Sequence, residues 1–373
     1  MVESTGTEIE SSGRLGAILG VSVPETHRQM YAEAKQFADE VLMPAADLHD
    51  REESFPESQV NALAEKGFLG ILAPEQYGGM GLDNLALTLA LEEINRGCAS
   101  TGVTLSVHNS LLSSPLLHFG TEEQKERFFP GLASGKSLGA YAITEPDHGS
   151  DALSIETTCR KEGDEWILNG TKAWITNGSR AGTIITFATM DPALRSTAIN
   201  AFVVDPSMPG YSVGKKELKL GIRGSDTVQL VFDEMRVPAA NLLGEEGQGF
   251  KIAMHTLDGG RVGIATQAVG IAQACLDAAV EFAEGHEMFG RRLADNQLVS
   301  HKIADMATRI EASRLLTLRA AMLKDAGAPH SRQASMAKLS ASEIANDAAR
   351  MALEIHGGAG IGRQSPIERL FRD

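Results

Sequence analysis

The chain has 373 residues, a formal net charge of −15 and a sequence pI of about 5.2. Hydrophobic residues make up 43% and charged residues 22%, which is ordinary for a folded globular protein with roughly two or three domains. General nucleic-acid binding and attraction to an anionic membrane surface are disfavoured, because both require a basic face.

The cysteines and histidines indicate neither disulfide bonds nor a metal site. Cys98, Cys159 and Cys275 are far apart and odd in number, and the ten histidines show no zinc-site spacing. No apolar run is expected to be long enough to cross a bilayer. Residues 1–23 have the composition of neither a signal peptide nor a transit peptide. We therefore expect a flexible N-terminal extension over residues 1–23, on a cytoplasmic protein without a bound metal.

Residues 24–137 have a helical pattern. Apolar residues recur at three- to four-residue spacing in several segments, and Ser100–Leu117 is nearly uncharged, which predicts a buried helix. Thr121 followed by Gln124 predicts a capped helix start. The amphipathic segments are Gln29–Val41, Glu57–Lys66 and Leu85–Asn95.

Residues 138–248 have a β pattern, in which short β-branched or aromatic runs are separated by Gly, Asn, Asp and Pro. No helix-length pattern lies between the runs, so we expect an antiparallel barrel or sandwich. The clearest runs are Glu165–Leu168, Gly182–Thr189, Asn200–Val204, Tyr211–Val213 and Thr227–Phe232.

Residues 249–373 are helical again and rich in alanine. Phe250–Phe282, Leu298–Ala326 and Ser331–Ile355 are too long for a small globular core and predict a helix bundle. The expected fold class is therefore multidomain α and β, with an N-terminal α-helical domain, a middle antiparallel β domain and a C-terminal long-helix bundle.

Two short runs in the β segment carry the chemistry. Tyr141–Asp151 places hydroxyls and free backbone amides where a strand breaks into a Pro/Gly turn, and Lys172–Gly178 places an aromatic ring two residues before a hydroxyl. A flat redox-active ring needs a stacking face, a donor near its reactive nitrogen and amides for its polar edge. Trp174 and Thr176 taken alone would more often be strand core and a strand-end hydroxyl. Their combination with the first run favours the cofactor interpretation.

Together the two runs resemble the flavin-cradling segments of the acyl-CoA dehydrogenase family. The α–β–α order extends this resemblance from about Pro24 to Asp373, and the match is closest to the short-chain (butyryl-CoA) branch. The resemblance implies the fold of that family and FAD as the cofactor. It implies that Trp174 covers the flavin ring and that Thr176 hydrogen-bonds its hydride-accepting nitrogen. The cofactor contacts implied in this part of the chain are Tyr141, Ile143, Thr144, Trp174, Ile175 and Thr176.

The resemblance also implies contacts with the cofactor of a neighbouring subunit. The run Gly357–Gly362 is by itself typical of a helix C-cap, and its first two glycines match the family's cofactor turn. His286 stands where the family has Arg, and Glu354 where it usually has Gln. Both changes make this half-site less positive toward a pyrophosphate, and Arg291 could compensate. The implied contacts here are His286, Phe289, Gln297, Glu354, Gly357 and Gly358.

Leu257–Ala265 opens a long helix although it contains two adjacent glycines, which weaken a helix. Close approach of another segment is therefore expected. Tight helix packing is one interpretation. The resemblance implies that Asp258 and Arg261 face the acyl-CoA, together with Ser150 from the first run. Some relatives carry the catalytic Glu where Gly260 stands.

In the branch that this chain resembles, the catalytic Glu lies in a Tyr-Glu-Gly-Thr-like turn beyond an Arg-Asp pair. Arg372-Asp373 is that pair, so the expected Glu lies beyond Asp373 and residues 1–373 supply no catalytic residue. Truncation of the chain accounts for this. An inactive or non-dehydrogenating relative is the alternative.

The implied function is FAD-dependent α,β-dehydrogenation of a short-chain acyl-CoA to the trans-2-enoyl-CoA, as in fatty acid β-oxidation. Electrons would pass to an electron-transferring flavoprotein. The implied assembly is a homotetramer, a dimer of dimers, without nucleic acid and without membrane insertion. One alternative is a flavoenzyme of the same fold that acts as an oxidase or by a base-free elimination. Another is a non-catalytic partner subunit similar to an acyl-CoA dehydrogenase.

Overall fold

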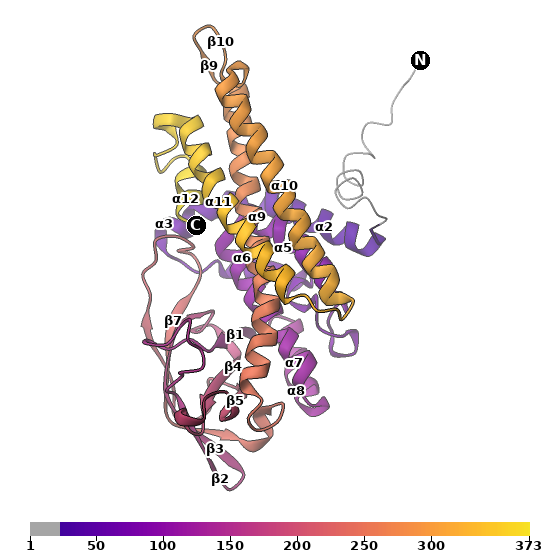
Figure 1. The fold of residues 1–373 in the computed structure, drawn as a ribbon, viewed down its shortest axis with the longest axis vertical. Coiled ribbons are helices and arrows are strands. Elements are labelled where there is room, and N and C mark those ends of the chain that lie inside the picture. The colour runs from indigo at the N-terminus through magenta and orange to yellow at the C-terminus, as the bar shows by residue number, and fades with distance from the viewer. Residues whose placement is uncertain (1–22) are drawn as a thin grey trace. The chain divides into compact units, whose positions relative to one another are not determined.

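The computed structural model describes residues 23–373 (Figure 1). The predicted flexible extension lies outside the described residues, apart from Val23. The described chain forms two compact units. The helical unit contains residues 23–51, 83–102 and 261–373, and the sheet unit contains residues 52–82 and 103–260.

The helical unit contains the long helices that the sequence predicts, with ends close to the expected ones. Helices α10 and α11 contact each other along their length, and α5 contacts both α2 and α10 (Figure 1). The bounds are α2 (Glu25–Phe37), the π-helical turn η1 (Ala38–Leu42), α3 (Met43–Glu52), α5 (Asn84–Gly97), the start of α6 (Ala99–Ser106), most of α9 (Gly249–Gly285), β9 (Glu287–Met288), β10 (Arg291–Arg292), the 3-10 turn η7 (Leu293–Asp295), α10 (Gln297–Asp325), α11 (Ser331–His356), the 3-10 turn η8 (Gly357–Ala359) and α12 (Pro366–Arg372).

Small side chains fill the core of the helical unit. Many of the buried positions on α9 and α11 are alanine, which accounts for the alanine-rich composition of this part of the chain. At Gly270 of α9 an added Cβ would lie 2.5 Å from the carbonyl oxygen of Glu92 on α5, so the two helices touch backbone to backbone. The buried Arg314 of α10 donates to Glu92 at 2.8 Å and to Gln273 of α9 at 2.8 Å. One guanidinium therefore links three helices.

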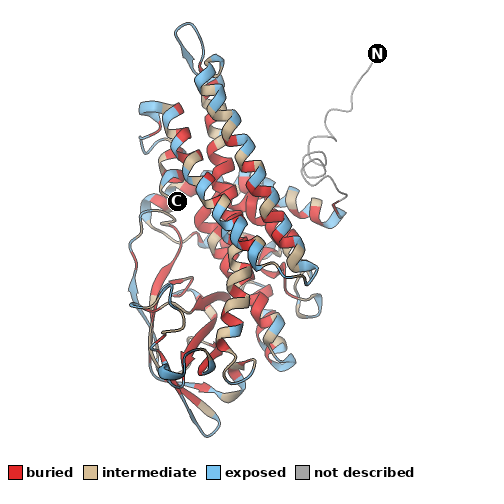
Figure 2. Ribbon diagram, viewed as in Figure 1, coloured by how far each residue is buried: buried red, intermediate tan, exposed pale blue. Residues whose placement is uncertain are grey.

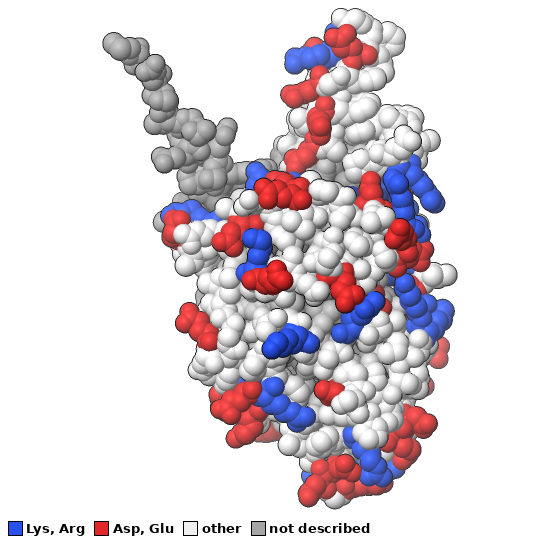
Figure 3. Space-filling model, turned by 180° about the vertical axis from the view of Figure 1, so that it is seen from behind, with Lys and Arg blue, Asp and Glu red and all other residues white. Residues whose placement is uncertain are grey.

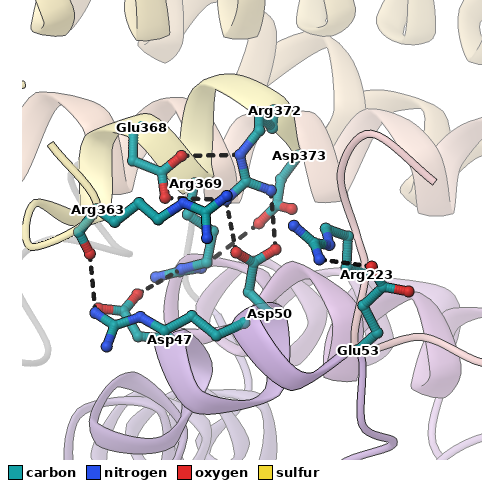
Figure 4. A network of polar contacts seen from close by, with 10 residues as sticks. Asp47, Asp50, Glu53, Arg223, Arg363, Glu368, Arg369, Arg372 and Asp373 are labelled. Carbon is teal, nitrogen blue, oxygen red and sulfur yellow. Dashed lines mark hydrogen bonds and ion pairs between the residues drawn. The ribbon is translucent and has the colours of Figure 1, made fainter. Parts of the chain in front are cut away.

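Helix α12 is attached to α3 by ion pairs (Figure 4). Arg372 donates to both carboxylate oxygens of Asp50, at 3.0 and 2.6 Å, and Arg369 donates to Asp47 at 2.9 Å. Asp50 and Arg369 are buried, so these pairs are less screened than surface ones. The contacts fix the short α12 against a helix more than 300 positions earlier in the chain.

Helix α9 departs from the expectation that no apolar run reaches membrane-spanning length. Among the described residues it alone is long and apolar enough to cross a membrane by length and composition, with a mean hydropathy of 1.2 over its best 18-residue window. Of that window 78% is buried inside the structure. The apolar composition of α9 is therefore that of a mostly buried helix.

The sheet unit contains every predicted strand, and β3 and β7 are longer than expected. Thr121 and Gln124 form the predicted capping box at the start of α8. The bounds are α4 (Glu57–Glu65), the 3-10 turns η2 (Phe68–Gly70) and η3 (Glu75–Tyr77), the rest of α6, the π-helical η4 (Val107–Ser113), α7 (Ser114–Phe119), α8 (Glu122–Ala133), β1 (Leu138–Ala142), β2 (Thr158–Glu162), β3 (Glu165–Thr176), β4 (Ala181–Thr189), η5 (Pro192–Thr197), β5 (Ile199–Val204), β6 (Tyr211–Lys216), β7 (Thr227–Pro238), η6 (Ala239–Asn241), β8 (Leu242–Leu243) and the first turns of α9.

The sheet has the strand order β6-β7-β3-β2-β4-β5-β8, with β1 paired to β4. Most neighbours are antiparallel, as predicted, but β1 and β2 both run parallel to β4. The predicted antiparallel β domain is thus observed, with two parallel pairings that the sequence did not indicate. The chain leaves β1 through a long turn and the β2–β3 hairpin before it reaches β4, and such a crossover permits parallel pairing.

Strands β1, β4 and β5 are buried on both faces (Figure 2). Tyr141, Phe187 and Val203 belong to one apolar cluster, which also contains residues of η4, α8 and α9. Ala142 and Phe202 belong to a second cluster, formed with β3 and β7. Burial on both faces explains why these strands read as continuous apolar runs.

A buried histidine joins the helices of this unit to β1. His108 of η4 accepts the backbone N–H of Gly139 at Nδ1, at 3.0 Å. Burial lowers the pKa of His108 to about 4, so the ring is neutral at pH 7. Because the ordinary value is 6.5, the stability that this neutral ring provides is present above about pH 6.5 and is lost as the pH falls toward 4.

We predict that His108 makes the stability of the sheet unit sensitive to acid. Between pH 7 and pH 5 this group should lower the free energy of unfolding by about 2 kcal/mol. His108→Asn keeps an acceptor for Gly139 but does not titrate, so this loss should disappear in chemical denaturation at the two pH values. The exposed His301 supplies a control, since His301→Asn should retain the full loss. Equal pH dependence in both variants would contradict the prediction.

Candidate functional site

The structure places Trp174 at an irregular position of β3. Lys172 pairs with Leu230 of β7. The next pair is Ile175 with Val228, which leaves one more residue in β3 than in β7 between the two pairs. Trp174 lies in this β-bulge with a φ of 61°, a region that bulky side chains rarely adopt, and it is 56% exposed. Such strain clusters at functional sites, and here it holds an aromatic ring out of the sheet.

The other predicted residues of this part divide into two groups. Ile143, Thr144 and Thr176 are half-buried and border the bulge, with Thr144 accepting the backbone N–H of Ala173 at 2.9 Å through its carbonyl oxygen. Each keeps part of its surface exposed, and Ile143 also packs against the apolar cluster that contains Tyr141.

Tyr141 and Ile175 lie in the core instead. The Tyr141 ring packs edge-on against Phe187 at 5.2 Å, and burial raises the pKa of Tyr141. Ile175 belongs to the apolar cluster between the sheet layers. The Tyr141 ring is thus enclosed within the sheet unit, and its implied contact with the flavin stays a prediction. These two residues support the site through packing and backbone.

Sequence reasoning missed a buried ion pair that joins the two runs, with one partner in each. Lys172 is completely buried and its Nζ lies 2.7 Å from Oε1 of Glu145, which is almost completely buried. Burial lowers the pKa of Lys172 to about 8, although the charge of Glu145 opposes this. For Glu145 burial acts upward, but the Lys172 charge and hydrogen bonds lower the pKa overall. The signals that could have identified the pair were a lysine within a predicted strand segment and a glutamate just after a strand, one in each run.

A second polar anchor lies at the end of β3. Asn177 is fully buried with a φ of 64°. Its side-chain amide donates to the carbonyl oxygens of Thr104 and Gly139, at 3.2 and 3.0 Å. Lys172 and Asn177 therefore fix β3 on both sides of Trp174 and Thr176.

The residues predicted to contact the acyl-CoA come from two elements, the turn after β1 and helix α9. Ser150 is exposed on the turn that follows β1. Asp258 and Arg261 are half-buried and lie three positions apart on α9. Between them Gly260 lies beside Leu111, and an added Cβ would lie 2.8 Å from Cδ2, the end of that side chain.

The helical unit presents the second predicted set of cofactor contacts. Phe289 and Gly290 form the two-residue turn between β9 and β10, both with positive φ, and the Phe289 ring is 92% exposed. The Phe282 ring stacks with the His286 ring, at 4.9 Å between centroids, and with the His356 ring, at 4.3 Å. Gln297 begins α10, and the adjacent glycines Gly357 and Gly358 have open space where a Cβ would stand.

The Glu354 carboxylate is paired with two cations. Lys302 donates to one carboxylate oxygen at 2.5 Å and Arg350 to the other at 2.5 Å. These hydrogen bonds, with that of Lys302 the stronger influence, lower the pKa of Glu354. Lys302 and Arg350 therefore partly offset the Glu354 charge, and the prediction that Glu354 makes this half-site less positive stays a prediction.

These features fit a planar redox cofactor better than a metal. Each unit offers an exposed aromatic ring on a strained backbone, and the sheet unit adds hydroxyls beside its ring. Within residues 23–373 no group of three or more His, Cys, Asp or Glu side chains could hold a metal ion. On the face that Figure 3 shows, acidic and basic side chains of the described residues are interspersed.

Comparison with known families gives matches along nearly the whole described chain. The N-terminal domain model of acyl-CoA dehydrogenases matches residues 24–136, the middle domain model residues 140–235 and the C-terminal domain model residues 247–373.

Individual relatives agree with these matches. The mitochondrial short-chain specific acyl-CoA dehydrogenase of Rattus norvegicus is 50% identical over 353 residues, which are 95% of this chain and 86% of the relative. The butyryl-CoA dehydrogenase structure of Megasphaera elsdenii has a TM-score of 0.92 at 40% identity and covers 94% of this chain and 93% of its own. A chain in a structure of the electron transferring flavoprotein of Acidaminococcus fermentans has a TM-score of 0.92 at 44% identity, covering 94% and 92%.

We predict that Trp174 trades backbone stability for a ligand contact. Trp174→Gly relieves the positive φ, so the melting temperature of the cofactor-free chain should stay equal or rise, by up to about 1 kcal/mol in stability. FAD should bind more weakly, because the stacking face is lost. Fluorescence titration with FAD and thermal unfolding measure the two effects. Trp174→Phe retains a ring and should bind FAD between the two, whereas unchanged affinity in Trp174→Gly would refute the role.

We also predict that Glu354 weakens FAD binding through charge. Glu354→Gln frees Lys302 and Arg350 and should tighten FAD about fivefold at low salt, since one unit charge at about 4 Å in water contributes about 1 kcal/mol. The gain should shrink at high salt. Glu343, exposed on the same helix, is the matched control, and Glu343→Gln should leave the FAD dissociation constant unchanged. A weaker affinity in Glu354→Gln would instead identify the carboxylate as a direct ligand.

Proposed function

Because the chain belongs to the acyl-CoA dehydrogenase family, whose members are FAD-dependent oxidoreductases acting on CH–CH bonds, we propose that its substrate is a short-chain acyl-CoA thioester. The product is the trans-2-enoyl-CoA. FAD supplies the two-electron acceptor when bound. The observation that carries the assignment is the bulge of β3, which presents an exposed Trp174 beside the half-buried Thr176 hydroxyl.

The residues of this chain have separate tasks in the proposed reaction. Trp174 covers one face of the flavin, while Thr144 and Thr176 offer hydroxyl groups to its polar edge. Ser150, Asp258 and Arg261 hold the thioester. Phe289, Gln297, Gly357 and Gly358 contact the cofactor of a neighbouring subunit, with His286 beside them. Each assignment rests on the resemblance of these positions together with their exposure or half-burial in the structure.

Electrons pass in this proposal to an electron-transferring flavoprotein. The similarity to a chain in the Acidaminococcus fermentans flavoprotein structure supports that partner. The proposed assembly is a homotetramer. Exposed apolar side chains on α10 and α11 support it, because such side chains are covered in oligomers. They are Leu298, Leu315, Met322, Met336 and Leu339. Three free buried cysteines support a reducing compartment such as the cytoplasm.

The catalytic base is proposed to be a Glu beyond Asp373, as the resemblance implies. Oxidase chemistry and base-free elimination remain the alternatives within the fold. A short-chain dehydrogenase relative at 50% identity supports the dehydrogenase.

We predict that an anaerobic titration with butyryl-CoA separates these functions. The full natural gene product loaded with FAD should lose its yellow colour, because a base and a bound thioester together allow reduction. Residues 1–373 loaded with FAD should bind butyryl-CoA and stay yellow. Absorbance spectra record both results. Bleaching by residues 1–373 would contradict a base beyond Asp373 and favour base-free chemistry.

Two further measurements define the substrate and the acceptor. A panel of straight and 2-branched thioesters should give the fastest bleaching with a short chain, and a preference for long chains would overturn the substrate class. Rapid oxygen consumption with butyryl-CoA would identify an oxidase. Thr176→Val should slow bleaching while leaving FAD bound, and an unchanged rate would remove Thr176 from the proposed site.

A further inference from the structure

The ion pair between Lys172 and Glu145 connects three segments of the sheet unit. Lys172 Nζ donates to Glu145 Oε1 at 2.7 Å and to the carbonyl oxygen of Ile143 at 3.4 Å. Glu145 also accepts the backbone N–H of Glu156 at Oε2, at 2.5 Å, and that of Thr157 at Oε1, at 3.0 Å. The two carboxylate oxygens therefore have three donors, from β3 and from the residues that precede β2.

Each of these segments carries a different part of the proposed site. Residues 143–145 contain Thr144, and β3 continues from Lys172 to Trp174 and Thr176. The bonds from Glu145 to residues 156 and 157 close the turn of residues 146–155, on which Ser150 is exposed. One ion pair thus lies between the cofactor side and the substrate side.

The close packing around the pair leaves little freedom for another arrangement. Gly170 of β3 has a φ of 151°, and an added Cβ there would lie 2.5 Å from Oγ1 of Thr157. The end of the Ser150 turn therefore rests directly on the backbone of β3. Two register shifts of β3 against β7, one on each side of Lys172, lie beside this contact.

Stability alone does not account for a pair of this kind. Removing two charges from water is expensive, and well-packed apolar residues of similar size often stabilise a fold as well or better. A buried ion pair does specify one arrangement, because every other arrangement leaves a charge without its partner. The feature that is specified here is the position of the Ser150 turn relative to Trp174.

We propose that Glu145 and Lys172 are positioning residues that couple the acyl-CoA turn to the cofactor-facing end of β3. The proposal rests on the proposed function for the identity of the two ligands. In this proposal the buried side chains of Glu145 and Lys172 do not contact FAD or the thioester. The pair keeps the Ser150 turn closed and the β3 bulge in register. The acyl-CoA turn and the cofactor-facing bulge therefore hold their relative position before either ligand binds.

The test compares Lys172→Met, Glu145→Gln and the double variant with the wild-type full gene product. Each single variant leaves one buried charge alone and should lower the melting temperature strongly. The double variant leaves no lone charge, keeps an acceptor oxygen for one of the two amides and should recover most of the melting temperature. It should nevertheless bind FAD and butyryl-CoA about tenfold more weakly, which corresponds to about 1.4 kcal/mol, because the turn and the bulge lose their fixed relative position.

Amide hydrogen exchange supplies a readout that a general stabilising role does not change. In the double variant the exchange of the Glu156 and Thr157 amides should accelerate, while the amides of β4 and β5 stay protected. Arg236→Met is the matched control, since it breaks an exposed ion pair between β7 and Glu165 of β3 (2.8 Å). That control should change neither exchange nor affinity.

Two outcomes would overturn the proposal. One is a double variant that binds FAD and butyryl-CoA within about twofold of wild type, which would make the pair purely structural. The other is unchanged exchange at Glu156 and Thr157. FAD affinity and exchange need no turnover, so a wild-type protein that no thioester reduces would contradict the proposed function while these two measurements still decide the role of the pair.

Discussion

The extra residue in β3 is the constraint on which the candidate site depends. In a strand that kept its register with β7, the Trp174 side chain would follow the regular alternation between the two faces of the sheet. The bulge instead places its backbone at a φ of 61° and its ring in solvent. Such a backbone persists only where neighbouring contacts enforce it, and Lys172 and Asn177 supply those contacts on either side.

Several buried polar side chains around β1 fix the geometry of neighbouring backbone segments. His108, Asn177 and the Glu145–Lys172 pair are buried, and each bonds to backbone groups of β1, of the turn that follows it or of neighbouring segments. Burying these groups is costly, so they add less stability than apolar side chains of the same size would. What they add is a single geometry for the turn and strand ends, which an apolar core specifies less sharply.

The helical unit solves a different problem. Its long helices pack through alanine and glycine, so side chains such as Phe289 and the His286–Phe282–His356 stack are left at the ends of the helices. Charges there are shared within small groups, and Glu354 is held between Lys302 and Arg350. The negative charge of Glu354, which is unfavourable toward an anionic ligand, is thus partly offset by Arg350 on the same helix and by Lys302 on α10.

Much of the fold was predictable because its signals are local. The spacing of apolar residues located the long helices, Thr121 and Gln124 marked a capping box, and β-branched runs located the strands. The residues around Trp174 and Thr176 indicated a flavin site before any geometry was known, through their resemblance to a family. The parallel pairing of β1 with β4 was not predictable, since register depends on segments far apart in the chain.

The sequence by itself determined the order of helices and strands, the family and the residues that are proposed to face the cofactor. Only the tertiary structure decided which of those side chains are open: it exposed Trp174, turned Tyr141 into the core and gave Glu354 two cationic partners. It also brought Glu145 and Lys172 together across 27 positions. The physical reason is that burial and charge pairing are properties of distances between segments, and a local pattern fixes only the conformation of each segment.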